Sequence, residues 1–509
     1  MSYLIGVDIG STSCKAIACD LNGRFLGVAS RPTMTNYLEN GWSELDAEKL
    51  WHAAFSCIQE VVAKAGDGHC EGLAVASMNG TVLLDDQDHP LHPSISWLDV
   101  RSDKIAEEWK RVYGADKIYQ ITGINPNAVA GITKIQWIKQ QYPELFSKAR
   151  RWLQMQDFIS YKLTGAAKVS YTNACRTMAF DLNTLDWSDE ILKAAGIPRD
   201  LLSEPVRSGT IIGFVTPWAE NQTGLKRGTP VYAGGIDYAC GAFATGIMDA
   251  GQMLNSTGTS EQVLVVTDKP QTDPAYREQN FTCVTHVVND KYYTMGMILA
   301  SGGIFEWFKR EFKCESFDEL IQEATKQPIG ANGCMILPYF CGKYSLGSSA
   351  TAKGAFAGLT LATKRGDIVR SIIEGLCYEM LANLAEIQRI SSTNIHSIYT
   401  IGGAARSDFW LQMKADVTGI TVKSKDVPEA AALGAAMLAG LGAKLFTSPA
   451  DAVQHMGHPE KAYTPIDENH QKYQKIYKTL YRDLYNGLNE FNHKLSDIQE
   501  CLATNKLHA

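Results

Sequence analysis

The first twenty residues place a strand, a polar turn and a second strand in immediate succession. The stretch 3–9 is mostly apolar, the turn follows at 10–13, and a second apolar run begins after Lys15. Glycine lets the backbone approach an oxyanion, and consecutive N–H and hydroxyl groups can donate to it. The segment predicts a phosphate site on a β-hairpin, formed by Ser11, Thr12, Ser13 and Lys15. An ordinary hairpin with a polar tip also fits.

A β-hairpin at this place differs from the two commonest glycine-loop nucleotide sites, in which a helix follows the loop. Neither GxxxxGK[ST] nor GxGxxG follows the first strand. The hairpin therefore favours another ATPase architecture. Asp8, at the end of the first strand, is a candidate to hold a hydrated divalent metal.

Length and composition bound the class of protein. At 509 residues the chain exceeds what one hydrophobic core usually serves, so we expect two domains. The net charge of −7 gives no basic footprint for nucleic acid or an anionic membrane. The chain shows neither a signal peptide nor an apolar run of about 18 residues. The 12 cysteines lack CxxC spacing and indicate reduced thiols in a cytoplasmic protein.

Strand-like runs alternate with helical patterns along the first half, which predicts an α/β fold. One strand, 72–77, ends at Met78 and Asn79. Farther on, Trp97, Asp99 and Arg101 stand at alternate positions, which share one face in an extended segment. An indole beside two charged hydrogen-bonding groups suits a sugar or polyol. The alternative is a surface strand with a structural ion pair.

The middle of the chain supplies a candidate catalytic group. A strand over 229–236 ends in two glycines and is followed at once by Asp237 and Tyr238. A carboxylate at the carboxyl end of a strand, with open space before it, is well placed to act as general base on a hydroxyl. The alternative role for Asp237 is to cap the helix that follows.

Two later segments repeat the glycine and hydroxyl pattern. Gly258 and Thr259 lie between two apparent strands, as the N-terminal turn does. Gly402 and Gly403 instead precede a helical pattern, with Ser407 at its start, where backbone donors and the helix dipole can meet a phosphate or ribose. We expect a second domain to begin close to the first of these segments, with the chain divided into 1–246 and 247–509.

Taken together, these motifs resemble the FGGY family of carbohydrate kinases, in the superfamily of actin, heat-shock chaperones and sugar kinases. The matches run in the family's order from Asp8 to Ala436 and include the turn at 8–13, the blocks at 78–80, 97–101 and 134–138, and those at 157–165, 234–237, 258–260 and 402–436. The resemblance implies two ribonuclease H-like domains around a cleft that holds ATP and Mg²⁺, with phosphate transfer to a sugar or polyol hydroxyl.

By position, the resemblance also implies residue roles. Asp237 corresponds to the family's base and Asp8 to its metal-side carboxylate. Met78, Asn79, Trp97, Asp99 and Arg101 fall where the family meets the sugar, and Tyr238 adjoins them. The implied ATP contacts are Ser11, Thr12, Ser13, Lys15, Gly258, Thr259, Gly402, Gly403 and Ser407.

Departures from the family pattern leave the acceptor open. Asn79 and Tyr238 stand where xylulose kinases tend to show histidine and asparagine, and 342–346 lacks the Gly-Glu-Arg-x-Pro run of many ketopentose kinases. The leading candidate for the phosphate acceptor is a ketose such as a pentulose. A polyol or sugar acid is the alternative, and Arg101 and Lys343 would favour an acid. A nucleotide switch without kinase activity is the rival from another class.

The closing segment 466–502 carries apolar residues at helical spacing. An amphipathic helix packed on its own domain explains them, and the sharper alternative is the seam of a homodimer. The residues in question are Tyr473, Ile476, Tyr477, Leu480, Leu484 and Leu488.

Overall fold

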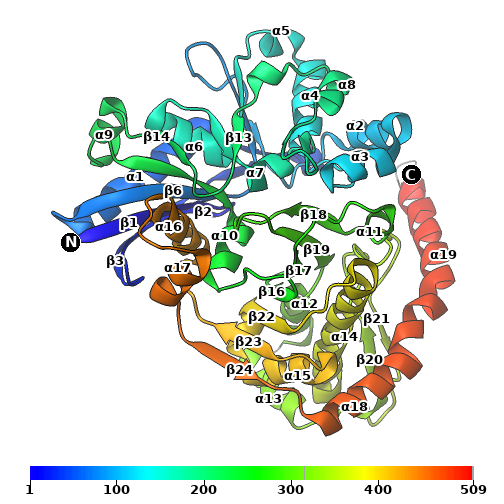
Figure 1. The fold of residues 1–509 in the computed structure, drawn as a ribbon. Coiled ribbons are helices and arrows are strands. Elements are labelled where there is room, and N and C mark those ends of the chain that lie inside the picture. The colour runs from blue at the N-terminus through cyan, green and yellow to red at the C-terminus, as the bar shows by residue number, and fades with distance from the viewer. Residues whose placement is uncertain (314–315, 507–509) are drawn as a thin grey trace.

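Two mixed β-sheets, each with helices on its faces, organise the chain (Figure 1). The computed structural model describes residues 1–313 and 316–506. The first sheet has the strand order β14-β15-β6-β1-β2-β3. Its strands are β1 (Ser2–Ile9), β2 (Ser13–Asp20), β3 (Phe25–Pro32), β6 (His69–Ser77), β14 (Ile211–Phe214) and β15 (Pro230–Ile236).

The second sheet draws its strands from the other half of the chain. Its order is β18-β19-β17-β16-β22-β23-β24. The strands are β16 (Gln252–Thr257), β17 (Glu261–Thr267), β18 (Thr282–Thr285), β19 (Tyr292–Ile298), β22 (Ser397–Gly402), β23 (Val422–Lys425) and β24 (Glu460–Tyr463).

The two sheets share one topology. In the first, β1, β2 and β3 are successive antiparallel partners, and β6 and β15 lie parallel to β1 on its other side. In the second, β16, β17 and β19 form the antiparallel run, and β22 and β23 continue parallel to β16. The similar glycine and hydroxyl patterns of the turns at 10–13 and 258–260 therefore reflect equivalent positions in two similar units. The predicted α/β fold class is confirmed.

Shorter strands form small sheets around these two. They are β4 (Thr35–Tyr37), β5 (Ser43–Leu45) and β8 (Ser94–Ile95) in one, and the pairs β7 (Thr81–Leu84) with β9 (Arg151–Gln154), β10 (Lys168–Ser170) with β13 (Glu204–Val206), β11 (Phe180–Asp181) with β12 (Asp186–Trp187), and β20 (Met335–Leu337) with β21 (Ala355–Ala357).

The helices cover the faces of both sheets. In the first half they are α1 (Ala47–Ala65), α2 (Asp103–Glu108), α3 (Ala115–Thr122), α4 (Gly131–Gln141), α5 (Pro143–Phe146), α6 (Met155–Thr164), α7 (Tyr171–Cys175), α8 (Asp189–Ala195), α9 (Pro217–Thr223) and α10 (Asp237–Ala244). In the second half they are α11 (Pro274–Glu278), α12 (Gly302–Phe312), α13 (Phe317–Thr325), α14 (Arg365–Ser391), α15 (Asp408–Thr418), α16 (Ala430–Gly442), α17 (Pro449–Met456), α18 (Asp467–Ile476) and α19 (Arg482–Lys506).

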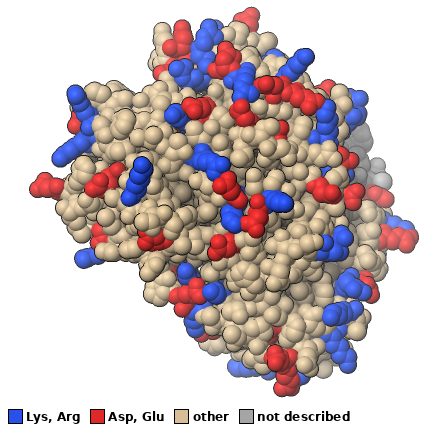
Figure 2. All heavy atoms as spheres, viewed as in Figure 1, with Lys and Arg blue, Asp and Glu red and all other residues tan. Residues whose placement is uncertain are grey.

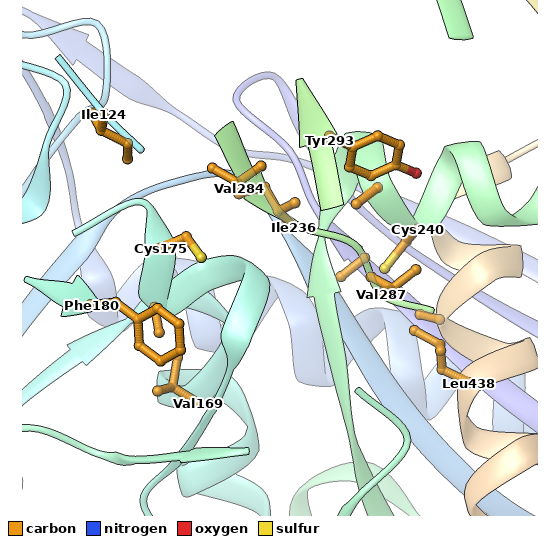
Figure 3. Close-up of a cluster of buried hydrophobic side chains, with 14 of the residues drawn as sticks. Ile124, Val169, Cys175, Phe180, Ile236, Cys240, Val284, Val287, Tyr293 and Leu438 are labelled. Carbon is orange, nitrogen blue, oxygen red and sulfur yellow. The ribbon is translucent and has the colours of Figure 1, made fainter. Parts of the chain in front are cut away.

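Period-two alternation along β1 divides its side chains between two cores. Ile5 and Val7 join the cluster under α1, whereas Leu4 joins the cluster that contains residues of α10 and α16. Helix α16, from the second half of the chain, therefore packs on the first sheet. The large mixed cluster also reaches Cys175, Val284 and Tyr293, which Figure 3 shows beside Ile236 and Cys240.

Glycines allow α10 and α16 to approach each other and the sheet closely. A Cβ at Gly434 would stand 1.9 Å from the carbonyl oxygen of Cys240, and one at Gly6 would stand 1.8 Å from that of Ala432. No side chain fits at either place. These two contacts fix α10, which begins with Asp237, against both halves of the chain.

The end of the chain runs along the outer edge of the second half (Figure 1). Tyr473 is buried there, and Ile476, Tyr477, Leu484 and Leu488 pack against the same core, so the stripe serves its own domain over most of its length. Leu480 instead is 56% exposed.

Acidic and basic side chains are interspersed over the face drawn in Figure 2. Among the described residues, no helix is both long and apolar enough to cross a membrane. The ten cysteines between Cys14 and Cys377 whose side chains the structure describes are free, and all of these except Cys341 are buried.

Candidate active site

The turn between β1 and β2 has the form of an anion-binding loop. Gly10 donates its N–H to the carbonyl of Ser13 at 3.0 Å, and the Thr33 hydroxyl donates to the carbonyl of Gly10 at 2.9 Å. The Thr12 carbonyl accepts from the Thr33 N–H at 3.0 Å. These bonds hold the loop from below and leave the predicted phosphate ligands Ser11, Thr12 and Ser13 at its solvent-accessible rim.

The turn between β16 and β17 is the second loop of this kind. Gly258 donates its N–H to the carbonyl of Ser260 at 2.8 Å. The carbonyls of Gly258 and Thr259 accept N–H groups at 301–303, where α12 begins. Gly258 and Thr259 are exposed, so the loop has free donors at a place equivalent to the first loop.

A buried charged network that sequence reasoning missed supports the second loop from beneath. Lys414 Nζ pairs with Glu261 Oε1 at 2.9 Å and donates to the Thr257 hydroxyl at 3.2 Å. Ser301 Oγ donates to the other oxygen of Glu261 at 2.9 Å. Each buried charge has a partner, so the network can hold the loop in one geometry.

The third glycine segment borders a cavity of about 950 Å³ beside the second loop. Gly402 has φ +84°, and a Cβ there would stand 2.2 Å from the carbonyl of Thr257, so the turn after β22 requires glycine. Ser407 caps α15, accepting the N–H of Trp410 at 3.3 Å. The lining includes Thr259, Gly302, Phe305, Phe317, Gly403 and Ser407, a mixture suited to a nucleoside with its phosphates.

Asp8 and Asp237 lie at one edge of the first sheet. Strands β1, β6 and β15 are parallel, with Ile9 opposite Ser77 and Ser77 opposite Ile236, so their carboxyl ends meet there. Asp237 is the first residue of α10 and accepts the N–H of Tyr238 at 2.7 Å. The cap position belongs to Ile236. The capping role considered for Asp237 is therefore not the one that it has.

Burial raises the pKa of both carboxyls. For Asp237, burial outweighs the Tyr238 N–H and the charge of Arg176 and raises the pKa to about 6. For Asp8, burial and the charge of Asp237 raise the pKa to about 8. Oxygen Oδ1 of Asp8 is buried and has no hydrogen-bond partner among the described residues. An unpartnered carboxylate oxygen beside a second carboxylate fits a hydrated Mg²⁺.

Lys15 reaches across to the second half of the chain. Its ammonium lies 2.8 Å from Glu429, which precedes α16 and has the left-handed backbone φ of +48°. A left-handed backbone conformation is uncommon for glutamate, and strained residues of this kind occur often at functional sites. Sequence reasoning placed Glu429 in the matching block at 402–436 but did not pair it with Lys15, because the two residues are 414 positions apart.

The predicted extended segment at 95–101 is wrong. Strand β8 ends at Ile95, and the chain then turns, so Trp97, Asp99 and Arg101 do not line one strand face. Both Asp99 oxygens are taken by Arg101, and one also accepts the Ser43 N–H at 2.6 Å. Lys134 Nζ holds the turn through the carbonyl of Ser96 at 2.7 Å. Asp99 and Arg101 thus form the structural ion pair considered as the alternative.

The other predicted sugar contacts lie near the first hairpin turn and the carboxyl ends of β6 and β15. Trp97 Nε1 donates to Ser11 Oγ at 2.9 Å, which joins this turn to the first phosphate loop. Met78 continues from β6 and is buried, and Asn79 donates to the carbonyl of Val129 at 2.9 Å. The Tyr238 phenol is buried without a hydrogen-bond partner among the described residues, and burial raises its pKa to about 12.

Two similar sheets, each with a glycine-containing hairpin turn, and a carboxylate pair at the edge of the first sheet have the architecture of a two-domain phosphotransferase of the actin-like ATPase class. The residues 3–244 and 253–443 match the N-terminal and C-terminal domains of the FGGY family of carbohydrate kinases. The chain belongs to this family and is a sugar kinase. Kinases of the family use ATP as phosphate donor, generally with Mg²⁺.

Individual relatives agree with the family. A xylulose kinase of Bacillus subtilis (strain 168) is 31% identical over 98% of this chain and 100% of its own length. The crystal structure of a xylulose kinase from Rhodospirillum rubrum superposes with a TM-score of 0.90 at 28% identity, over 96% of this chain and all of that one. A gluconate kinase from Lactobacillus acidophilus also gives 0.90, at 25% identity over 97% of this chain and 99% of that one.

Proposed function

We propose that the protein transfers the γ-phosphate of ATP to a hydroxyl of a ketose, with a pentulose such as xylulose as the leading acceptor. The observation that carries the proposal is the position of Asp237, at the sheet edge shared with Asp8 and the first phosphate loop. Relatives named xylulose kinase support the choice of acceptor. The proposed site residues are those given by the sequence, except that Asp99 and Arg101 act through the fold.

In the proposed reaction Asp237 accepts the proton of the attacking hydroxyl. A pKa of about 6 keeps this carboxylate largely ionised near neutral pH while leaving it basic enough to take a proton. The two loops and the start of α15 supply donors for the phosphates, which stabilises charge that develops on the transferred group. Magnesium, when bound at Asp8, neutralises phosphate charge. The domain division at 246 and 247 remains part of the proposal.

A kinase for a sugar acid is the second candidate, supported by the likeness to a gluconate kinase. The two basic residues that favoured an acid do not strengthen it. The Arg101 guanidinium is bound by Asp99 and Glu44, and Lys343 Nζ stands 4.2 Å from the centre of the Tyr485 ring. Pentuloses therefore remain the first candidates for the acceptor.

A coupled ADP-release assay with Mg-ATP tests the proposal across pentuloses, hexuloses, polyols and aldonates, with a control lacking sugar. We expect one pentulose to raise turnover far above the control. A preference for an aldonate would support the second candidate. Equal ATP hydrolysis with and without every sugar would contradict both and favour a nucleotide switch.

We further propose a homodimer that acts in the cytoplasm, where ATP is available and free thiols persist. Three large apolar side chains on α19, Phe491, Ile498 and Leu502, are 57–61% exposed and recur at helical spacing. Light scattering after gel filtration should give twice the monomer mass, and Ile498→Asp should give the monomer. A monomeric native protein would contradict this.

A further inference from the structure

Arg176 lies beside the proposed base Asp237, and no hydrogen bond found among the described residues involves its guanidinium. It follows α7 directly, and its backbone carbonyl accepts the N–H of Gly131 at 3.3 Å. Helix α7 is tied to the end of β15, because Thr172 Oγ1 accepts the N–H of Ile236 at 2.9 Å. The residue before Arg176, Cys175, lies at the junction of the two halves, near Val284 and Ile236 (Figure 3). Arg176 is thus held close to Asp237.

The guanidinium of Arg176 is unsatisfied. Nitrogen Nη1 is buried and finds no hydrogen-bond partner in the described part of the chain, and its side chain makes none of the ion pairs found there. Two arginines that are buried as whole residues differ. Arg101 is saturated by Asp99 and Glu44, and Arg370 by Glu374 and Tyr473. A buried charged donor without a partner is costly, so in a native structure it calls for a specific reason, such as a functional role or a bound water or ion.

A second unsatisfied group accompanies it. The Tyr238 hydroxyl is also buried and unpartnered within the described residues. The positive charge of Arg176 lowers the pKa of both Asp237 and Tyr238, although burial raises each of them on balance. The guanidinium of Arg176, the phenol of Tyr238 and the proposed base therefore lie close to one another.

We infer that Arg176, together with the Tyr238 hydroxyl, binds an oxygen of the acceptor sugar next to the hydroxyl that Asp237 deprotonates. Arg176 is thus a residue that positions the acceptor and sets specificity. The group recognised is a hydrogen-bond acceptor, either the carbonyl or a hydroxyl of a ketose or the carboxylate of an aldonate. Binding there satisfies both orphaned groups at once and fixes the attacking oxygen relative to the γ-phosphate.

This inference rests on the proposed kinase activity, so the test begins with the best acceptor of the wild-type panel. The variants are Arg176→Gln, Arg176→Lys and Tyr238→Phe, with Arg389→Gln as control. Arg389 lies on the surface of α14, and its guanidinium pairs with Glu386 of the same helix. We expect Arg176→Gln to lower kcat/KM for the sugar about 10- to 100-fold and to leave the KM for ATP unchanged.

Deoxy analogues of the acceptor separate binding from a merely structural role. For the wild type, removal of the sugar oxygen held by Arg176 should lower kcat/KM. For Arg176→Gln, kcat/KM should be the same for this analogue and for the parent sugar. Arg176→Lys retains the positive charge but lacks the planar guanidinium, so its kcat/KM should lie between those of the wild type and Arg176→Gln. This variant also tests the inference if the glutamine variant fails to fold. A loss much greater than 100-fold, confined to an aldonate, would assign the oxygen to a carboxylate.

Two failures are distinguishable. If the wild type phosphorylates no acceptor in the panel, the proposed function is wrong. If it does, and the Arg176 variants show the same penalty as the wild type for every analogue, Arg176 has no part in recognition and the inference is overturned.

Discussion

At the residue scale, the account depends on the ionisation of Asp237. Burial holds its pKa at about 6, so the base is ionised above that pH and protonated below it. We expect kcat/KM, measured at saturating Mg-ATP, to fall about tenfold per pH unit below 6 and to level off above it. A profile that is flat from pH 5 to pH 7 would contradict the assignment of the base.

Replacement of the same carboxyl separates chemistry from binding. We expect Asp237→Asn to reduce phosphoryl transfer by about two to four orders of magnitude, because the amide takes no proton. ATP affinity should stay near the wild-type value, since the nucleotide cavity lies beside the second loop. Calorimetric titration with ADP and a turnover assay check both parts. Substantial turnover in this variant would remove Asp237 from the base role.

Sequence reasoning found the residues that a local pattern marks. The loops at 10–13 and 258–260 and Asp237 stand where a strand gives way to glycine and polar groups, and the fold keeps them at strand ends. It missed the pairing of Glu429 with Lys15, and it missed Arg176 altogether. Glu429 meets Lys15 from 414 residues away, and Arg176 lies at the end of a five-residue helix without a motif of its own. Only the tertiary fold brings these charges to the cleft.

At the element scale, the glycine contact between α10 and α16 sets the position of the base. We expect Gly434→Ala to destabilise the protein by about 1–3 kcal/mol, because its Cβ would collide with the carbonyl of Cys240. It should also lower turnover, because α10 carries Asp237. Differential scanning calorimetry and the kinase assay measure the two effects.

Gly487→Ala is the matched control. Gly487 lies within α19 with nothing within 4 Å of its would-be Cβ, so alanine should stabilise this helix by about 0.5–1 kcal/mol and leave turnover unchanged. Equal effects of the two substitutions would show that close packing of α10 on α16 does not matter.

The wrong prediction of an extended segment at 95–101 also concerns a whole element. Alternate spacing of Trp97, Asp99 and Arg101 satisfied the strand pattern, but a turn can place the same residues. The partners that decided the matter, the Ser43 N–H and Lys134, come from other elements. The α/β class and the helix after Gly403, by contrast, were predictable because periodicity and turn residues agree there.

At the scale of the whole molecule, the site is assembled from both halves. Each sheet carries one of the two loops that we propose bind phosphate, and Lys15 and Glu429 link the two halves. Kinases must keep water from the γ-phosphate, so we expect the halves to close when both substrates bind. Small-angle scattering should show a smaller radius of gyration with a non-hydrolysable ATP analogue and the sugar together. An unchanged radius would contradict closure.

The central claim is that the cleft transfers phosphate to a sugar and not to water. The direct measurement is mass spectrometry of the reaction mixture after incubation with ATP labelled in the γ-phosphate, Mg²⁺ and D-xylulose or the best acceptor of the panel. The account predicts a sugar monophosphate that carries the label in amounts equal to the ADP formed. Labelled inorganic phosphate in its place, with no sugar phosphate, would contradict it.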